Sequence, residues 1–145
     1  MLIDHGTLIM VADGRKMLVF RNAGTGARPR LETEAVRAQD NPASRDQASD
    51  APGRMDTPRG PGSAMEPTDF HDLEERHFAQ EAAALLNRRA LDNDFEKLII
   101  VAPPTTLGEM RRHYHKAVEQ RLVAEIAKDL SNHPVPEIEK IIDAS

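Results

Sequence analysis

Residues 95–118 read FEKLIIVAPPTTLGEMRRHYHKAV, and this stretch decides the class of fold. The run LIIV at 98–101 contains no polar residue, which predicts a central strand covered by protein on both faces. Two prolines end the strand, and the residues from Thr106 to Glu109, TLGE, are typical of a capping box at the start of a helix. A strand that leads directly into a helix predicts an α/β protein.

The junction between this strand and helix, APPTT, is a place where many α/β proteins hold a phosphate. Such sites use backbone amides and glycines at the helix start. Here Pro103 and Pro104 have no amide proton, and Gly108 lies inside the expected capping box. We therefore interpret Thr105 and Thr106 as helix caps and expect no phosphate site and no cofactor.

Toward the N-terminus, the chain predicts an antiparallel meander. The apolar run 7–12 is followed by Asp13-Gly14, a strong hairpin pattern, and then by a second strand at 16–22. In residues 30–38 apolar and acidic side chains alternate, which favours a half-exposed edge strand.

Further along the chain, helices and strands alternate. Residues 68–91 predict an amphipathic helix, His113 marks a break in the next helix, and 121–129 predict a last strand before a helix that begins at Pro136. We therefore expect one domain spanning 1–145, with a mixed α/β sheet of about five strands: a meander, then helix, strand, helix, strand and helix.

Composition narrows the classes of function. The net charge of −5 disfavours non-specific binding to nucleic acid, although a local basic patch remains compatible with it. The chain has no cysteine, so disulfides, cysteine zinc sites and cysteine nucleophiles are excluded. We find no pattern of a signal peptide or membrane span and expect a cytoplasmic protein that does not contact a membrane.

Residues 39–67 show neither the periodicity of a helix nor that of a strand. They hold five of the ten prolines and three of the eight glycines, and methionines are their only large apolar residues. We expect a long flexible loop, because the segment cannot bury enough apolar surface to offset the entropy of ordering it. A loop of this length is usually functional, so we predict that Arg45, Arg54 and Arg59 bind a partner.

The start of the 68–91 helix carries the other candidate residues. His71 and Glu75 are four positions apart, close enough on a helix to bind one metal ion, but no third ligand is placed by the sequence. We favour a polar rim beside the loop, with both residues contributing to partner binding and no metal. No nucleophile elbow or pair of carboxylates stands out, so we expect no catalytic residue and no enzyme activity.

Five motifs follow one another along the chain: VADGRKMLVF (11–20), DAPGRMD (50–56), HDLEERHFAQEAAALL (71–86), FEKLIIVAPPTTLGEMR (95–111) and AEIAKDL (124–130). In this order they resemble the bacterial host-attachment protein family, named for attachment of bacteria to host cells. That family is similar to the middle domain of the archaeal and eukaryotic class-1 translation termination factor, and the resemblance therefore implies a ribonuclease-H-like α/β fold.

One departure limits what the resemblance implies. The termination factor carries a Gly-Gly-Gln tripeptide before its long helix, whereas this chain has TPRGPGSAMEP and no glutamine between Gln47 and Gln80. Our first hypothesis is a non-enzymatic protein that acts indirectly in host attachment through an unknown protein partner. The alternative is an accessory factor that binds the ribosome or tRNA, and a hydrolase using His71 and Glu75 is a third hypothesis.

The loop provides the first test. We expect Arg54→Ala combined with Arg59→Ala to weaken partner binding without unfolding, because guanidinium groups offer a rigid fork of donors. Replacing 39–67 by a short Gly-Ser linker should change the free energy of unfolding by less than about 1 kcal/mol, since closure entropy varies slowly with length. Ribosome sedimentation, melting curves and amide exchange measure these effects, and collapse of the shortened protein would show that the loop is structural.

Overall fold

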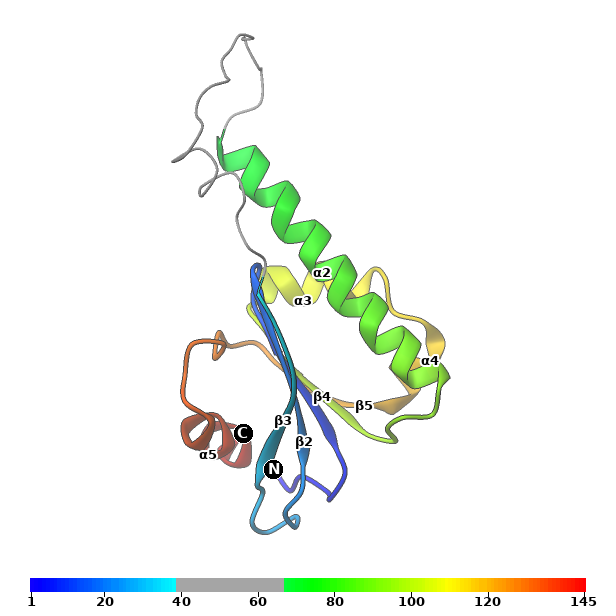
Figure 1. The fold of residues 1–145 in the computed structure, drawn as a ribbon, viewed down its shortest axis with the longest axis vertical. Helices are drawn as coiled ribbons and strands as arrows, with labels where there is room; N and C mark the ends of the chain where they lie inside the picture. The colour runs from blue at the N-terminus through cyan, green and yellow to red at the C-terminus, as the bar shows by residue number, and fades with distance from the viewer. Residues whose placement is uncertain (39–66) are drawn as a thin grey trace, which may run out of the picture.

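The computed structural model describes residues 1–38 and 67–145, with the side chains of the helix that begins at Pro67 described from residue 73 onward. These residues form five strands and four helices (Figure 1). The strands are β1 (Leu8–Ala12), β2 (Lys16–Asn22), β3 (Leu31–Ala38), β4 (Leu98–Val101) and β5 (Leu122–Ile126). The helices are α2 (Pro67–Leu91), α3 (Pro104–Arg111), α4 (Lys116–Arg121) and α5 (Val135–Ala144).

The strands form one mixed sheet in the order β3-β2-β1-β4-β5. β2 is antiparallel to both β1 and β3, whereas β4 is parallel to both β1 and β5. The N-terminal meander and the mixed five-stranded α/β sheet are therefore confirmed. β4 pairs with β1 on one side and β5 on the other, and all four of its residues are buried, as expected for LIIV.

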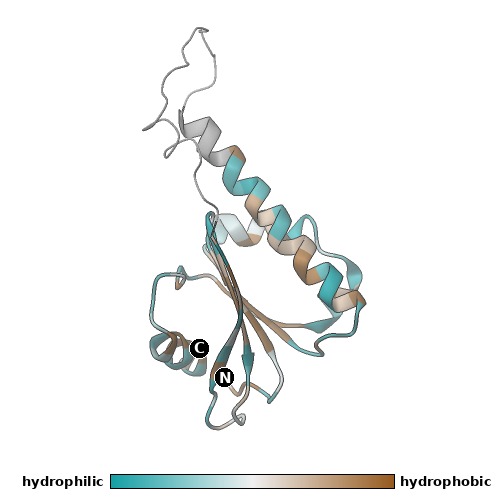
Figure 2. Ribbon diagram, in the orientation of Figure 1, coloured by the Kyte–Doolittle hydropathy of each residue, from teal (hydrophilic) through white to brown (hydrophobic). Residues whose placement is uncertain are grey.

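Each face of the sheet has its own hydrophobic core, because alternate side chains of β1 and β4 point to opposite faces. Leu8, Met10, Leu98 and Ile100 pack under α2, α3 and α4, while Ile9, Val11, Ile99 and Val101 pack under α5. Figure 1 shows the three helices on one side of the sheet and α5 on the other, and Figure 2 shows apolar residues along the strands between them.

α2 packs closely against the sheet because many of its buried residues are small. Phe78 and Leu86 supply the bulk of its apolar surface, and between and beyond them Ala79, Ala82 and Ala90 are at most 1% exposed. In contrast, residues 75–77 are exposed, and the start of the helix extends past the sheet in Figure 1. The buried stripe of the predicted amphipathic helix therefore begins at Phe78, and Glu75 before it is exposed.

The capping box predicted at Thr106 and Glu109 is wrong. α3 begins at Pro104, and its N-cap residue, Pro103, makes no hydrogen bond through a side chain. Proline suits the first position of a helix because its backbone angle is already helical and its missing amide has no partner there in any case. Thr105 and Thr106 consequently lie in the first turn rather than before it.

Two other boundaries differ from expectation. β5 ends at Ile126 instead of residue 129, because its partner strand β4 ends opposite at Val101. α5 begins at Val135, one residue before the expected Pro136. The break predicted at His113 is confirmed, since α3 ends at Arg111 and α4 begins at Lys116.

The buried position of β4 yields a stability prediction. Ile99→Ala and Ile100→Ala should each lower the free energy of unfolding by about 2–5 kcal/mol, because each leaves a cavity in one of the two cores. Val123 on edge strand β5 is 52% exposed, so Val123→Ala serves as the control and should change stability by only about 0.5 kcal/mol. Urea unfolding measures the three variants, and equal stabilities would contradict the assignment of β4.

Candidate functional site

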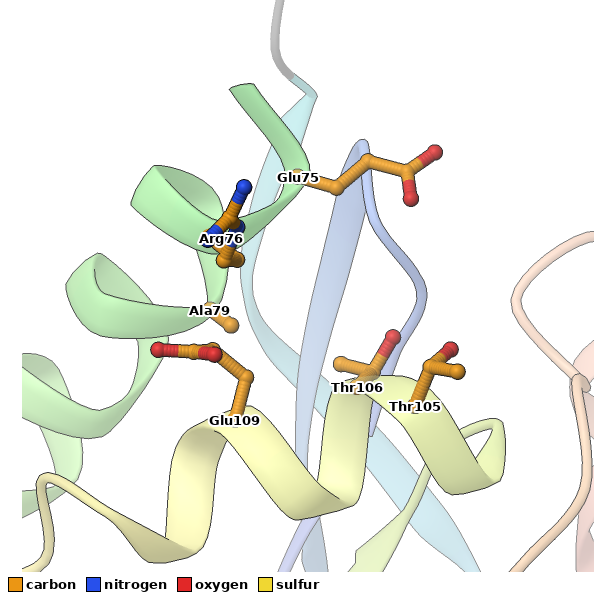
Figure 3. A pocket seen from close by; sticks show the side chains of 6 residues that line it. All are labelled: Glu75, Arg76, Ala79, Thr105, Thr106 and Glu109. Carbon is orange, nitrogen blue, oxygen red and sulfur yellow. The ribbon is translucent and has the colours of Figure 1, made fainter. Parts of the chain in front are cut away.

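A groove of about 330 Å³ lies between α2 and α3 at the edge of the sheet where β1 and β4 end. The α2 side contributes Glu75, Arg76 and Ala79, and the α3 side contributes Thr105, Thr106 and Glu109 (Figure 3). Two regions that the sequence singled out, the start of the long helix and the APPTT junction, therefore meet in one groove. In α/β proteins, ligands generally bind outside the carboxyl ends of the strands, which is the edge occupied here.

Of the five residues predicted to bind a partner, the structure places the side chain of Glu75 in this groove. Its aliphatic part lies over the β1–β2 hairpin, since a Cβ added to Gly14 would come within 2.5 Å of Glu75 Cγ. Arg45, Arg54 and Arg59 lie outside the described residues, and so does the side chain of His71. The predictions for these four residues remain predictions.

The two carboxylates of the groove have different surroundings. Glu109 is largely buried and accepts a hydrogen bond from His113 Nε2 at 3.1 Å, with Arg112 Nη1 3.7 Å away. Glu75 is exposed and points away from Glu109, with Arg76 on α2 next to it (Figure 3). The groove thus offers separate carboxylates, one guanidinium and threonine hydroxyls, a set suited to recognising a polar group by hydrogen bonds.

His71 and Glu75 are the pair whose spacing in the sequence could suit a metal ion. Among the residues whose side chains are described, 1–38 and 73–145, no three His, Asp or Glu residues are grouped in a way that could hold a metal ion. The carboxylate of the β1–β2 turn, Asp13, stabilises the turn itself: its Oδ1 accepts hydrogen bonds from the amides of Arg15 and Lys16 at 2.7 Å each.

A network of four charged side chains forms at the opposite end of the sheet. Arg21 donates to Glu34 at 2.8 Å and to Asp94 at 3.1 Å, and Arg89 donates to the same two carboxylates at 2.6 Å each. These bonds join β2, β3, the end of α2 and the loop before β4. The sequence analysis did not identify this network, because its members are far apart in the chain.

A β-bulge aims Glu34 at this network. Val19 pairs with Ala35 while Phe20 pairs with Thr33, so Glu34 is an extra residue on β3. A bulge rotates the strand and places two successive side chains on the same side. Glu34 thereby shares the α2 side with Ala35, which simple alternation along the strand does not predict.

The network lowers the pKa values of both carboxyl groups. The hydrogen bond from Arg21 holds the pKa of Glu34 below its usual value of 4.5, and Arg89 adds to the effect. For Asp94, partial burial raises the pKa, but the hydrogen bonds and charges of Arg89 and Arg21 outweigh it and leave the pKa below 3.8. Both groups are therefore anionic across the neutral range.

A second hollow, of about 510 Å³, lies beside this network and is lined in part by Arg21, Asp94 and Lys97. Lys97 is paired with Asp4 there. Thr7, which is 2% exposed, also lines the hollow, and its hydroxyl has no hydrogen-bond partner among the described residues. Positive and negative side chains in this hollow offset one another, so the hollow favours neither an anionic nor a cationic ligand.

Comparison with known proteins identifies the family. The sequence model of the Bacterial archaeo-eukaryotic release factor family 12 matches residues 6–142, nearly the whole chain. The chain belongs to this family. The match includes the groove, the charge network and residues 39–66 alike.

Two individual proteins are similar to this member of release factor family 12. Uncharacterized protein RP470 of Rickettsia prowazekii (strain Madrid E) is 33% identical over 87 residues, which make up 58% of each chain. The crystal structure of the archaeal translation termination factor aRF1 aligns with 95% of this chain at a TM-score of 0.43 and 13% identity. The alignment covers 35% of that factor, so the chain corresponds to about a third of its length.

These comparisons change one expectation. The likeness to release factors is confirmed at the level of the family, but the host-attachment name suggested by the sequence motifs gains no support from any of them. Within the parts of the chain that the structure describes, none of the helices has the length and apolar character needed to cross a bilayer.

The charge network of this family member predicts how stability depends on pH. A carboxyl group with a lowered pKa stabilises the folded state fully above its unfolded pKa, and this contribution is lost as the pH falls through the folded value. We therefore expect the free energy of unfolding to fall as the pH drops below about 5, and Glu34→Gln to lower stability at pH 7 and reduce this pH dependence.

Glu32→Gln is the matched control, because Glu32 lies on the same strand and its side chain is 65% exposed. Within the described part of the chain, its one ion-pair partner is Arg30, at 3.9 Å. Urea unfolding of the three proteins at pH 7 and pH 4 measures the effect. If Glu34→Gln and Glu32→Gln behave alike at both pH values, the network does not stabilise the fold.

Proposed function

We propose that the chain is an accessory factor that associates with the ribosome or tRNA and uses a release-factor-like fold. The observation that carries this proposal is the match of residues 6–142 to a release factor family. Membership over nearly the whole chain favours a role connected with translation. It supports that role better than host attachment, which rests on motif resemblance alone and remains a prediction.

We further propose that the chain acts without releasing nascent peptides. The Gly-Gly-Gln tripeptide that the resemblance assigns to peptidyl-tRNA hydrolysis does not occur in the sequence. The residues lining the groove include carboxylates, threonine hydroxyls and a guanidinium, which support recognition more directly than hydrolysis. The expected activity is therefore binding to a site that a release factor or tRNA would otherwise occupy.

The end of the molecule that carries the groove is the best candidate for contact with such a partner. α2 begins directly after residues 39–66, and its exposed positions 75–77 lie at this end. Glu75 and Arg76 from α2, with Thr105 from α3, present polar groups there (Figure 3). A partner seated on this end would contact both helices at once.

The proposal predicts that the purified protein sediments with ribosomes. In sucrose gradients at low salt, we expect the protein in fractions of the bacterial ribosome or one of its subunits, and also retained by immobilised tRNA if tRNA is the target. Binding to the ribosome should weaken as salt is raised, because contact with RNA phosphates releases counterions.

A peptide-release assay completes the test. Ribosomes carrying formylmethionyl-tRNA should release no more formylmethionine with this protein than with buffer, whereas a bacterial release factor serves as the positive control. Absence of binding to ribosomes, subunits and tRNA would reject the proposed function. Release above the buffer level would reject the non-catalytic part alone.

A further inference from the structure

The turn between α3 and α4 concentrates positive charge. Residues 111–116 read RRHYHK, with three Lys or Arg residues, two histidines and no acidic residue. Arg112, His113, His115 and Lys116 are exposed, while Tyr114 points inward and packs against the core under α2. We call residues 112–116 the basic turn.

The basic turn is held in one conformation by α2. The side chain of Asn87 donates to the carbonyl of His113 at 2.8 Å and accepts from the amide of His115 at 2.7 Å. The ring of His115 accepts a hydrogen bond from the amide of Ala117 at 3.0 Å and caps α4. Burial and the nearby Glu125 raise the pKa of Tyr114, so the buried ring is neutral. Such a turn presents its outer side chains with little loss of entropy on binding.

The cations of this region divide into two groups. Arg111 donates to Glu125 at 2.9 and 2.5 Å, and Arg121 donates to Phe95, Ala117 and Asn93, so both hold the fold together. In contrast, the Arg112 side chain is 73% exposed, and among the residues that the structure describes its one ion pair is the 3.7 Å approach to Glu109. Lys116 is exposed and forms no ion pair with any residue that the structure describes.

Helix stability does not explain both exposed cations. A cation near the end of α3 is favourable, because the carboxyl end of a helix is partially negative, and this accounts for Arg112. Lys116, however, is the first residue of α4, where the partial positive charge of the helix disfavours a cation. A binding role accounts for both positions.

The overall acidity of the chain does not oppose such a role. Residues 39–72 contain seven acidic and three basic residues, so they hold most of the net charge of −5. The remainder of the chain is nearly neutral. A basic turn on that remainder therefore creates a local positive surface, which attracts polyanions within roughly a Debye length of about 10 Å.

We propose that the basic turn binds the sugar-phosphate backbone of RNA, with Arg112 and Lys116 contacting phosphates and the ring of His115, whose Nδ1 accepts from Ala117, adding a donor beside them. The choice of RNA rests on the proposed function, while the surface itself rests on the geometry of the turn. Guanidinium and ammonium groups on a rigid turn match the chemistry of neighbouring phosphates, since the fork of arginine binds one bidentately and lysine acts as a point charge.

The test is fluorescence anisotropy with a labelled RNA hairpin at several salt concentrations between about 50 and 200 mM. We expect Arg112→Ala combined with Lys116→Ala to bind about tenfold more weakly and to reduce the salt slope by about two, because each cation neutralises one phosphate. Among the described residues, Arg112 approaches one carboxylate, Glu109, at 3.7 Å, and Lys116 is exposed without an ion pair, so the melting temperature should change little.

Arg28→Ala combined with Arg30→Ala is the matched control, because both are exposed arginines, on the β2–β3 loop. This control should bind the hairpin within about twofold of wild type. Equal weakening by both double variants would show that binding depends on general charge, and unchanged binding with an unchanged salt slope in the Arg112 and Lys116 variant would overturn the proposal. Tighter binding to phosphatidylglycerol vesicles than to RNA, lost in the same variant, would assign the turn to a lipid surface instead and overturn it as well.

Ribosome sedimentation separates this inference from the proposed function. If wild type sediments with ribosomes and the Arg112 and Lys116 variant does so equally, the proposed function stands and the basic turn is rejected as its RNA contact. If wild type binds the hairpin through the turn but sediments with no ribosomal particle and binds no tRNA, the proposed function fails while the RNA-binding surface stands.

Discussion

The fold depends on the pairing of β1 with β4, two strands that are apolar on both faces. Leu8 pairs with Leu98 and Val11 with Val101 in parallel register, and every residue of both strands is buried. Two such strands cannot face water on either side, so helices must cover the sheet twice. α2, α3 and α4 provide one cover and α5 the other, and the groove, the charge network and the basic turn lie at the margins of these layers.

The cover on the α2 side also organises the two ends of the sheet. Toward its end, α2 supplies Arg89 to the charge network and Asn87 to the basic turn. Toward its start, it supplies Glu75 and Arg76 to the groove. One helix thus buries β1 and β4 and also positions the groove, the charge network and the basic turn.

The connection from β4 to β5 carries both surfaces on which function is proposed. α3 forms one wall of the groove, and the turn after it bears the exposed cations. Because α3 and α4 are short and separated by a sharp turn, the chain passes from the groove to the basic turn within a few residues. An RNA bound to the turn and a partner bound at the groove would therefore both contact the segment that links β4 to β5.

The local pattern of the sequence determined the strands, the hairpin at Asp13-Gly14, the break at His113 and the sheet of about five strands, because alternation and apolar runs report burial directly. The sequence pattern predicted the wrong start for α3. It suggested a capping box at Thr106 and Glu109, but the helix begins two residues earlier at Pro104, because proline is favoured in the first turn of a helix.

Only the tertiary structure decided how distant polar residues combine. The sequence nominated Glu75 and the APPTT junction separately, and packing of α2 on α3 brought them into one groove. The bulge that aims Glu34 at Arg21 and Arg89 depends on register between β2 and β3, which a single strand does not encode. Side chains that are far apart in the chain become neighbours through packing. The periodicity of a local segment carries no information about which distant residues it will contact.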